Sequence, residues 1–148
     1  MAITLNRLGF RVYATVLNTE SESVERMLMR AKDRQHMVVM KMDVTSDEDV
    51  DRVYNQVCDD LRKCDRNLWA IVNNAGIMIC SRIEWGTLRD HTRVFDVNVF
   101  GTMRVTRVFL PLVKESQGIH YTTIYIYIYS YTYTHTHTHT LHLSFQNL

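Results

Sequence analysis

The sequence predicts an α/β fold organised around a parallel β-sheet. Short runs rich in β-branched and aromatic residues alternate with longer segments in which apolar residues recur every three or four positions. The first pattern is typical of strands and the second of amphipathic helices. In addition, the apolar run at residues 68–72 ends abruptly at Asn73-Asn74-Ala75-Gly76, as a buried strand does at the ligand-binding edge of an open sheet. Strands that alternate with helices of this length indicate βαβ units.

The first predicted strand lies between two helices. Residues 3–8 have the pattern of the last turns of a helix, and Gly9 supplies its C-terminal stop. Residues 11–16 are rich in β-branched and aromatic residues and predict a strand. Ser21 or Ser23 can then cap a helix whose apolar face comprises Val24, Met27, Leu28 and Ala31.

A second strand and the longest predicted helix follow. Residues 37–42 form the strand, and Asp43 terminates it. Ser46 caps the helix, and its first turn at residues 47–49 is entirely acidic, as the helix dipole favours. The apolar residues recur at spacings of three and four and predict a buried stripe of Val50, Val53, Tyr54, Val57 and Leu61.

The third strand, at residues 68–72, precedes the last helical region. Thr87, with Asp90 three residues later, predicts a capped helix start. The helical region continues towards Gly118 and carries Val94, Phe95, Asn98, Met103, Val108 and Phe109. We interpret the Met, Val and aromatic stripes of the chain as core residues rather than as cofactor contacts.

The composition changes after Gly118. From Tyr121 onward the chain alternates Tyr with Ile, then Tyr with Thr, then His with Thr, which is what a TA dinucleotide tract grading into a CA tract encodes in one frame. We therefore divide the chain into a domain at residues 1–118 and an irregular low-complexity tail at residues 119–148, attributed to intron read-through. Residues 121–134 carry no charge and no Pro, and could fill a loosely docked strand beside residues 68–72. Deletion of the tail is expected to raise solubility without loss of structure.

Five segments together resemble the short-chain dehydrogenase/reductase family, and within it the branch of retinol, steroid (17-beta-hydroxysteroid) and 3-hydroxybutyrate dehydrogenases. The resemblance extends from about Ile3 to Gly118. It implies a Rossmann-like, doubly wound parallel sheet of which the first strand and its Gly-rich turn are missing. It also implies hydride transfer between NAD or NADP and a secondary alcohol or ketone. The segments are residues 8–14, 42–45, 68–76, 97–102 and 109–112.

The same resemblance implies an incomplete catalytic site. Members of the family use a Ser, an Asn, and a Tyr-x-x-x-Lys pair in which the Lys lowers the pKa of the Tyr, because a phenol ionises near pH 10 on its own. Asn98 matches the family's Asn, which kinks its helix and anchors a proton-relay water. The alternative role for Asn98 is a local bond within its helix. No Lys follows Lys114, so the tyrosines of the tail cannot complete the Tyr-x-x-x-Lys pattern.

For the cofactor, the resemblance implies contacts by Asp43 with the adenine, and by Asn73, Ala75 and Gly76 beside the adenine ribose and beyond. Asp43 could instead be a strand-end acid that caps the next helix. The glycines of the chain are too dispersed to form a phosphate cradle. Residues 16–18, at the end of the first strand, contain neither acid nor base, and the absence of Arg favours NAD over NADP.

Several other classes of protein are disfavoured. The net charge of +1 and the lack of a Lys/Arg cluster argue against nucleic-acid binding, and neither a leader nor an apolar membrane span is evident. Three cysteines, without a C-x-x-C spacing, predict reduced thiols and an intracellular protein. An endoplasmic reticulum membrane or a mitochondrion follows only from the resemblance.

Two alternative functions remain. The family's dimers pack through the helix that contains Asn98, so the chain could be a non-catalytic partner of a full-length paralogue, in a homo- or hetero-oligomer. Alternating histidines in the tail would share one face of an extended segment and could hold a transition metal. Because no acid lies near them to orient the imidazoles, we predict no metal site at His135, His137, His139 and His142.

Overall fold

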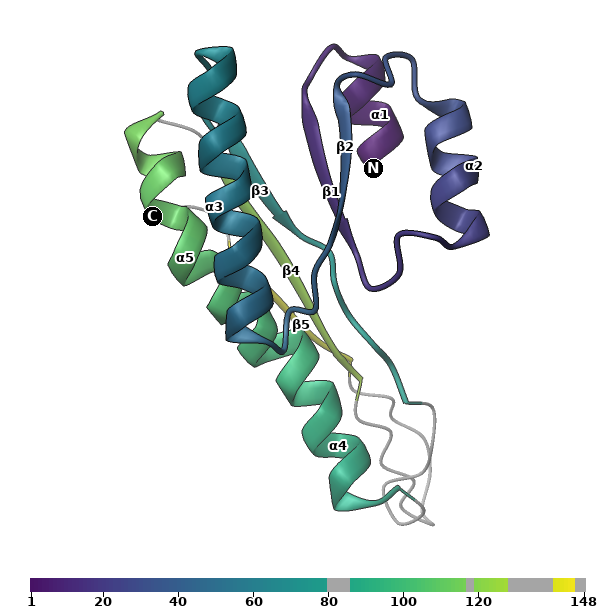
Figure 1. Ribbon diagram of the computed structural model, residues 1–148. Helices are drawn as coiled ribbons and strands as arrows, with labels where there is room; N and C mark the ends of the chain where they lie inside the picture. Colours follow the sequence, from purple (N-terminus) through teal and green to yellow (C-terminus); the bar gives the residue numbers. More distant parts are fainter. Residues whose placement is uncertain (80–85, 117–118, 128–139, 146–148) are drawn as a thin grey trace. The chain divides into compact units, whose positions relative to one another are not determined.

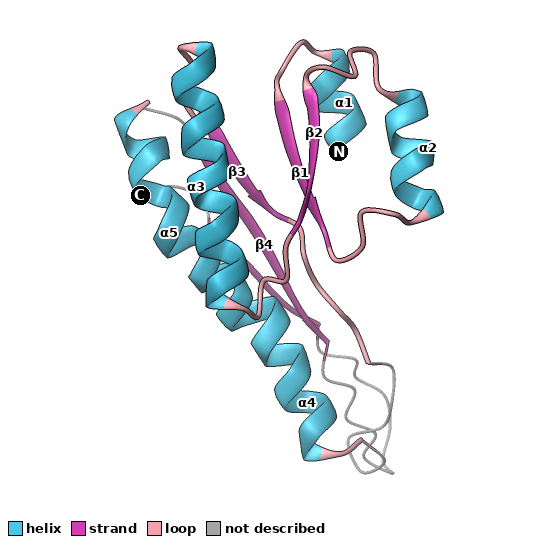
Figure 2. Ribbon diagram, in the orientation of Figure 1, coloured by secondary structure: helices cyan, strands magenta, loops and turns pink. Residues whose placement is uncertain are grey.

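The computed structural model describes residues 1–79, 86–116, 119–127 and 140–145 (Figure 1). The chain divides into two compact units, Met1–Asp60 and Leu61–Leu148. Each unit contains a parallel pair of strands and the helix that connects them (Figure 2). The fold is therefore α/β and partially Rossmann-like, as predicted. The described strands form a two-stranded sheet in the first unit and a three-stranded sheet in the second.

The first unit is a β-α-β arrangement preceded by a short helix. Its strands β1 and β2 pair in parallel, from Val12 opposite Met37 to Val16 opposite Lys41. The predicted helices and strands of this region are confirmed, with bounds shifted by a few residues. They are α1 (Ala2–Arg7), β1 (Val12–Val16), α2 (Glu22–Arg30) and β2 (Met37–Lys41).

Gly9 ends α1 as the sequence predicts. Its φ of +94° lies in the left-handed region, which glycine adopts without steric cost. The backbone N–H of Phe10 reaches back to the carbonyl of Leu5 at 3.2 Å, a bond typical of a glycine-terminated helix. On the same helix, the buried Asn6 carboxamide donates to the carbonyl of Asp33 at 2.8 Å and accepts from the N–H of Asp33 at 3.1 Å. This pair of bonds holds α1 against the loop before β2.

Helix α2 begins after Ser21, one of the two predicted capping residues. Ser21 has the extended backbone of a capping position, but its side chain makes no capping bond. The hydroxyl of Ser21 instead donates to the carbonyl of Asn18 at 3.2 Å. The predicted apolar face is partly confirmed, because Val24 is buried while Met27 and Leu28 are half-buried.

Helix α3 (Asp47–Cys64) carries the most deeply buried side chains of the described residues. Ser46 caps it as predicted, since its hydroxyl oxygen accepts from the N–H of Asp49 at 3.2 Å. The helix ends at a left-handed residue, Asp65, with φ of 50°. The predicted buried stripe is confirmed except for the half-buried Tyr54; the buried members are Val50, Val53, Val57 and Leu61.

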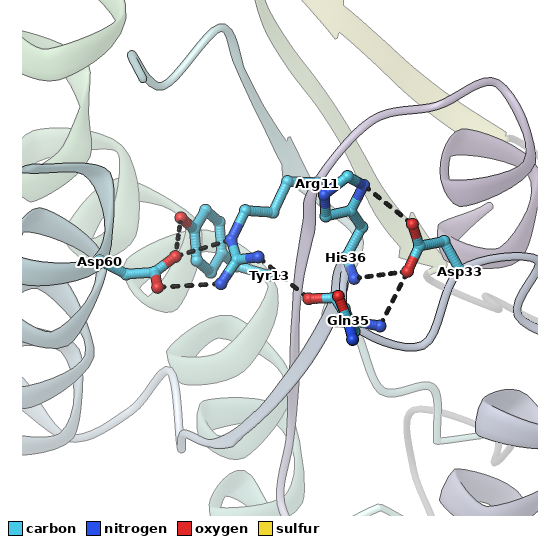
Figure 3. A network of polar contacts seen from close by, with 6 residues as sticks. All are labelled: Arg11, Tyr13, Asp33, Gln35, His36 and Asp60. Atoms are coloured by element: carbon cyan, nitrogen blue, oxygen red, sulfur yellow. Dashed lines mark hydrogen bonds and ion pairs between the residues drawn. The ribbon is translucent and has the colours of Figure 1, made fainter. Parts of the chain in front are cut away.

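A polar network joins the start of β1 to α3 within the first unit (Figure 3). Arg11 pairs with Asp60 through two parallel bonds, at 2.7 and 2.9 Å, and also donates to the carbonyl of Gln35 at 2.9 Å. The Tyr13 hydroxyl donates to Asp60 at 2.6 Å. The Asp60 carboxylate holds the pKa of the Arg11 guanidinium above its ordinary value. Burial, followed by the bond to Asp60, raises the pKa of Tyr13 to about 12.

We expect the stability of the protein to respond to pH through Tyr13. Between its ordinary pKa of 10.0 and the folded value of about 12, the unfolded chain releases the phenolic proton while the folded chain keeps it. Stability should therefore fall as pH rises through this window. Tyr13→Phe should unfold at lower denaturant concentration near neutral pH but should lose less stability between pH 10 and 12. Denaturant titrations of both proteins across this pH range test the prediction. Free energies of unfolding that fall in parallel with pH in the two proteins would contradict it.

The second unit contains a three-stranded sheet with β4 in its centre. Strand β3 pairs in parallel with β4, from Ala70 opposite Ile119 to Asn73 opposite Thr122. Strand β5 pairs antiparallel with β4, from Thr122 opposite Phe145 to Tyr127 opposite Thr140. The elements are β3 (Ala70–Asn73), α4 (Leu88–Phe95), the π-helix η1 (Asp96–Gly101), α5 (Thr102–Glu115), β4 (Ile119–Tyr127) and β5 (Thr140–Phe145).

The backbone of the C-terminal segment differs from the predicted irregular tail. Part of it is regular, because β4 and β5 are strands of the sheet. Strand β4 lies beside β3, the place anticipated for residues 121–134, and it begins earlier, at Ile119. Period-two alternation gives these residues strand propensity whatever their origin. Most of the His-Thr segment lies outside the described residues, and the domain boundary at residue 118 stays a prediction.

Candidate functional site

The end of β3 supplies the first part of the candidate site. Asn73 is buried, and its carboxamide donates to the hydroxyl of Thr106 on α5 at 3.0 Å. The amide therefore bonds to the helix that covers β3. The next three residues, Asn74, Ala75 and Gly76, are exposed and have no regular secondary structure. Two residues with small side chains thus leave a stretch of open backbone directly beyond the strand.

Asn98 supplies the second part, from the π-helix between α4 and α5. Its carboxamide oxygen accepts from the N–H of Ile77 at 2.8 Å, and its carboxamide nitrogen donates to the carbonyl of Ile77 at 2.9 Å. Asn98 is only 5% exposed. Its backbone carbonyl accepts from the Thr102 hydroxyl at 2.9 Å. A π-helix is rare and often marks a functional position.

The two hydrogen bonds to Ile77 show what the Asn98 side chain contacts. They are not the local bond within the helix that was the alternative role, because Ile77 lies 21 positions away. Asn98 therefore joins the segment after β3 to the α4–α5 helix. Both the oxygen and the nitrogen of the Asn98 carboxamide bond to the Ile77 backbone, so this side chain is held in a fixed orientation. The role of Asn98 in catalysis stays a prediction.

Gly76 lies directly over Asn98. A Cβ built at Gly76 would lie 3.5 Å from the Asn98 carboxamide oxygen, an ordinary van der Waals distance. Packing against Asn98 therefore does not require glycine. What glycine leaves at this position is exposed backbone, which a planar ring or a ribose can approach closely. These residues fit the nucleoside portion of a dinucleotide, whereas the dispersed glycines offer no fit to its pyrophosphate.

Asp43 lies in the first unit, at the end of β2. One carboxylate oxygen accepts from both the N–H and the hydroxyl of Thr45, at 2.9 and 2.8 Å. The backbone N–H of Asp43 donates to Asp49 at 2.9 Å. Arg52, and then this N–H, lower the pKa of Asp49. Asp43 thus stabilises the turn that leads into α3, while Ser46 caps the helix itself.

Of the predicted residues of the second unit, the structure brings Gly76 and Asn98 together beside Ile77, whereas Asn73 bonds to Thr106 and Ala75 adjoins Gly76 in the chain. Sequence reasoning missed the hydroxyl groups that support them, because Thr102 and Thr106 look like ordinary helix residues. It also missed Ser116, whose hydroxyl donates at 2.6 Å to the carbonyl of Leu68 and so joins the end of α5 to the segment before β3.

The entrance to α4 is confirmed as a capped start. Thr87 accepts from the N–H of Asp90 at 3.2 Å, and Asp90 accepts from the N–H of Thr87 at 3.1 Å, which is a complete capping box. The bonds from Thr87 lower the pKa of Asp90. A capping box aligns α4, and with it η1, relative to the chain that enters from residue 86.

Other predicted features are only partly described. Cys58 is half-buried and Cys64 is exposed, no disulfide joins them, and Cys80 lies outside the described residues. Within the described ranges, no three His, Cys, Asp or Glu side chains gather as a metal ion would require. His135, His137 and His139 lie outside those ranges, and of His142 only the backbone is described, on β5. No described helix has both the length and the apolar character needed to cross a membrane.

Replacement of Asn98 should destabilise the second unit. Asn98→Ala removes both partners of the Ile77 backbone and should lower the free energy of unfolding by about 2 kcal/mol. Asn98→Asp should keep the Ile77 N–H protected from hydrogen exchange but place a carboxylate against the Ile77 carbonyl. Asn55→Ala, on the exposed face of α3, is the matched control. Unchanged protection of the Ile77 amide in Asn98→Ala would contradict this role.

The described fold is α/β and partially Rossmann-like, and comparison with known proteins shows its family. Residues 1–120 match the family described as short chain dehydrogenase. The chain belongs to the short-chain dehydrogenase family.

Curated relatives cover a similar span of the chain. Rat estradiol 17-beta-dehydrogenase 2 is 36% identical over 119 residues, which are 80% of this chain and 30% of that protein. Bovine mitochondrial D-beta-hydroxybutyrate dehydrogenase is 32% identical over 120 residues, 80% of this chain and 34% of that protein. Mouse retinol dehydrogenase 7 is 35% identical over 118 residues, 80% and 35% of the two chains. The chain thus spans about a third of the length of these relatives.

Solved structures share the fold. A short-chain dehydrogenase from Streptomyces avermitilis has a TM-score of 0.63 and 29% identity, and the match covers 79% of this chain and 39% of that one. An alcohol dehydrogenase from Thermococcus sibiricus, complexed with 5-hydroxy-NADP, has a TM-score of 0.66 at 23% identity, covering 80% and 50% of the two chains. The second likeness concerns the fold alone.

Proposed function

We propose that this chain carries part of the cofactor site of an NAD(P)-dependent oxidoreductase. The substrate of such an enzyme would be a secondary alcohol or ketone of the steroid, retinol or 3-hydroxybutyrate kind, as in the named relatives. The observation that carries this proposal is the Asn98 contact with Ile77 beneath the exposed backbone of Ala75 and Gly76. It combines a buried, immobilised helix residue with an open backbone surface at the carboxyl end of a parallel strand, where α/β proteins bind ligands.

In the proposed site, the chain's own residues bind and orient the cofactor. The bound nicotinamide would supply the hydride acceptor or donor. Ala75 and Gly76 would offer exposed backbone to the ribose, and Asn73 would hold that backbone in place through its bond to Thr106. A contact of Asp43, in the first unit, with the adenine stays a prediction from the family resemblance. Asn98 would hold a water at its backbone carbonyl, which also accepts from the Thr102 hydroxyl at 2.9 Å.

The charges beside β1 support NAD over NADP. Glu20 lies two positions after Asn18, and its N–H donates to the Asn18 carboxamide oxygen at 2.9 Å. On α2, Arg26 pairs with Glu22 at 2.8 Å. Residues 16–18, at the end of β1, include no Arg or Lys that could bind a 2′-phosphate, which favours NAD.

Proton transfer is the step that these residues do not supply. No Tyr in the 148 residues is followed four positions later by a Lys. We therefore propose that this polypeptide binds without turnover. Residence at a mitochondrion or an endoplasmic reticulum membrane stays a prediction from the family.

Ligand-observed NMR tests the proposed cofactor site directly. Saturation transfer from the chain to NAD should appear at the ribose and ring protons, and adenosine monophosphate should show a weaker effect. Gly76→Val should reduce the transfer because it fills the exposed backbone, whereas Gly86→Val, outside the described contact, serves as the control. Equal transfer to NAD in Gly76→Val and in the unsubstituted chain would rule out this site.

A second function, binding to another dehydrogenase chain, is favoured by one observation. The helix that contains Asn98 leaves two large apolar side chains exposed, Phe100 at 53% and Met103 at 60%. Exposed apolar side chains that cluster on one helix face are typical of interaction surfaces. We propose that the α4–η1–α5 helix is the surface through which this chain, without catalytic turnover of its own, would bind another dehydrogenase chain.

A further inference from the structure

Four exposed cations gather at one end of the first unit, the end at which β1 and β2 begin. Arg7 ends α1, Arg30 ends α2, and Lys32 and Arg34 lie in the loop before β2. We call these four residues the basic end. No single segment of the sequence predicts the basic end, because Arg7 joins the other three cations only when α1 packs against that loop.

Hydrogen bonds hold the segments of the basic end together. The Asn6 carboxamide, beside Arg7, bonds twice to the backbone of Asp33, at 2.8 and 3.1 Å. The Arg34 Nε donates to the carbonyl of Leu28 at 3.3 Å, which ties the loop to the last turn of α2. The turn after α1 and the loop before β2 lie side by side at the amino ends of the strands (Figure 1). The four cations therefore belong to one folded surface.

Little of this positive charge is neutralised within the first unit. Among the described residues, no ion pair engages any of the four cations. The carboxylate of Asp33, in the same loop, already accepts from the N–H groups of Gln35 and His36, at 2.9 and 3.2 Å, and lies 3.3 Å from the His36 ring. Asp60, on α3, is held by two bonds from Arg11 (Figure 3).

Most acids of the first unit lie at the other end, where β1 and β2 finish. Besides Asp33 and Asp60, the exception is Asp59, which is exposed near the end of α3. The unit therefore has a basic end and an acidic end, and an anionic surface would attract the first and repel the second. The acids of the acidic end follow β1 or β2 in the chain and are Glu20, Glu22, Glu25, Asp43, Asp47, Glu48, Asp49 and Asp51.

Large apolar side chains are exposed beside these cations. Leu8, next to Arg7, is 70% exposed, and Met29, next to Arg30, is 75% exposed. Phe10, in the same turn as Leu8, is 40% exposed. The phosphates of a nucleic acid gain nothing from such side chains, whereas a lipid surface accepts apolar side chains below its headgroups and basic ones among them. The combination favours a membrane surface over a soluble polyanion.

We propose that the basic end binds the surface of a membrane that contains anionic lipids. The four cations would lie among the lipid headgroups, and Leu8 and Met29 would insert just below them. The first unit would thus rest on the membrane without crossing it, and its acidic end, with Asp43, would face water. This inference stands on charge and exposure in the first unit and is independent of the proposed oxidoreductase function.

Vesicle co-sedimentation of the full 148-residue chain tests this proposal. The chain should bind vesicles of phosphatidylcholine with phosphatidylserine at least about tenfold more tightly than vesicles of phosphatidylcholine alone, and added salt should reduce the difference. Arg30→Gln with Lys32→Gln should lower the affinity for the anionic vesicles at least about tenfold, because each cation near the surface contributes to binding. Arg89→Gln with Arg93→Gln removes two exposed cations from α4 and is the matched control, which should leave the affinity nearly unchanged.

The apolar part of the surface is tested separately. Leu8→Ser with Met29→Ser should weaken binding to the anionic vesicles, and circular dichroism verifies that each variant remains folded. Equal binding to the two kinds of vesicle would overturn the proposal, and so would equal losses in the Arg30/Lys32 variant and its control. A uridine oligonucleotide or polyglutamate that binds more tightly than the vesicles, whether or not Leu8 and Met29 are replaced, would make a soluble polyanion the partner instead. Loss of NAD binding with vesicle binding retained would count against the cofactor site alone.

Discussion

Oxidation of a steroid, retinol or 3-hydroxybutyrate by a polypeptide of these 148 residues should not exceed the uncatalysed rate, with NAD or NADP present. The reaction requires a group that exchanges a proton with the alcohol oxygen near neutral pH. A phenol performs this step only beside a cation that lowers its pKa. In this chain no Tyr has a Lys four positions later. Tyr13 illustrates the opposite case, since burial and the Asp60 carboxylate raise its pKa to about 12.

The expected loss of catalytic rate is large, because acid–base catalysis alone contributes roughly a hundredfold to ten-thousandfold. Loss of cofactor positioning lowers the rate further, although the two effects do not simply multiply. Formation of reduced cofactor by the purified chain measures the rate, with rat estradiol 17-beta-dehydrogenase 2 as the positive control. Dehydrogenase activity that co-purifies with the chain and disappears in Asn98→Ala would contradict the prediction. Such a result would mean that an unrecognised proton donor is present.

The second large effect concerns the strand that follows α5. Contrary to the expectation from the sequence, a chain ending at residue 118 should lose the structure of the second unit, whereas a chain ending at residue 127 should retain the β3–β4 pair. Strand β3 has β4 as its parallel partner from Ala70 to Asn73, and each ladder bond lost costs about 1 kcal/mol. Ile71, buried at 8% exposure, would also become accessible to water.

Hydrogen exchange of the Ile71 and Asn73 amides distinguishes the two truncated chains. Protection should be lost in the chain of residues 1–118 and retained in the chain of residues 1–127. If both chains protect these amides equally, then residues from 119 onward are dispensable, as the low-complexity interpretation of the tail holds. Soluble yield should increase in both, because each lacks the uncharged alternating residues 128–134.

Features with local causes could be predicted from the sequence. Gly9 ends α1, Ser46 caps α3, and Thr87 with Asp90 opens α4, because each signal depends on neighbours within a few residues. The apolar periodicity of α3 likewise predicted its buried valines. The family resemblance is confirmed over residues 1–120, and it rests on motifs that are contiguous in the chain.

The tail was predicted both as irregular and, from its alternation without Pro or charge, as a possible strand beside residues 68–72. The second prediction is confirmed, because β4 pairs in parallel with β3. Ser21 is a similar case on a smaller scale. It occupies the capping position of α2, but its hydroxyl donates to the carbonyl of Asn18 instead.

By itself, the sequence determined the class of fold, the family, and which helices and strands form, because those follow from periodicity and short motifs. The tertiary structure decided what the polar side chains do. Asn98 bonds a backbone 21 positions away, Asn73 a hydroxyl 33 positions away, and Arg11 a carboxylate 49 positions away. No local pattern encodes such partners, because they depend on how β3 packs against α5 and on how β1 packs against α3 within the first unit. A buried polar group takes whichever partner the packing brings within reach.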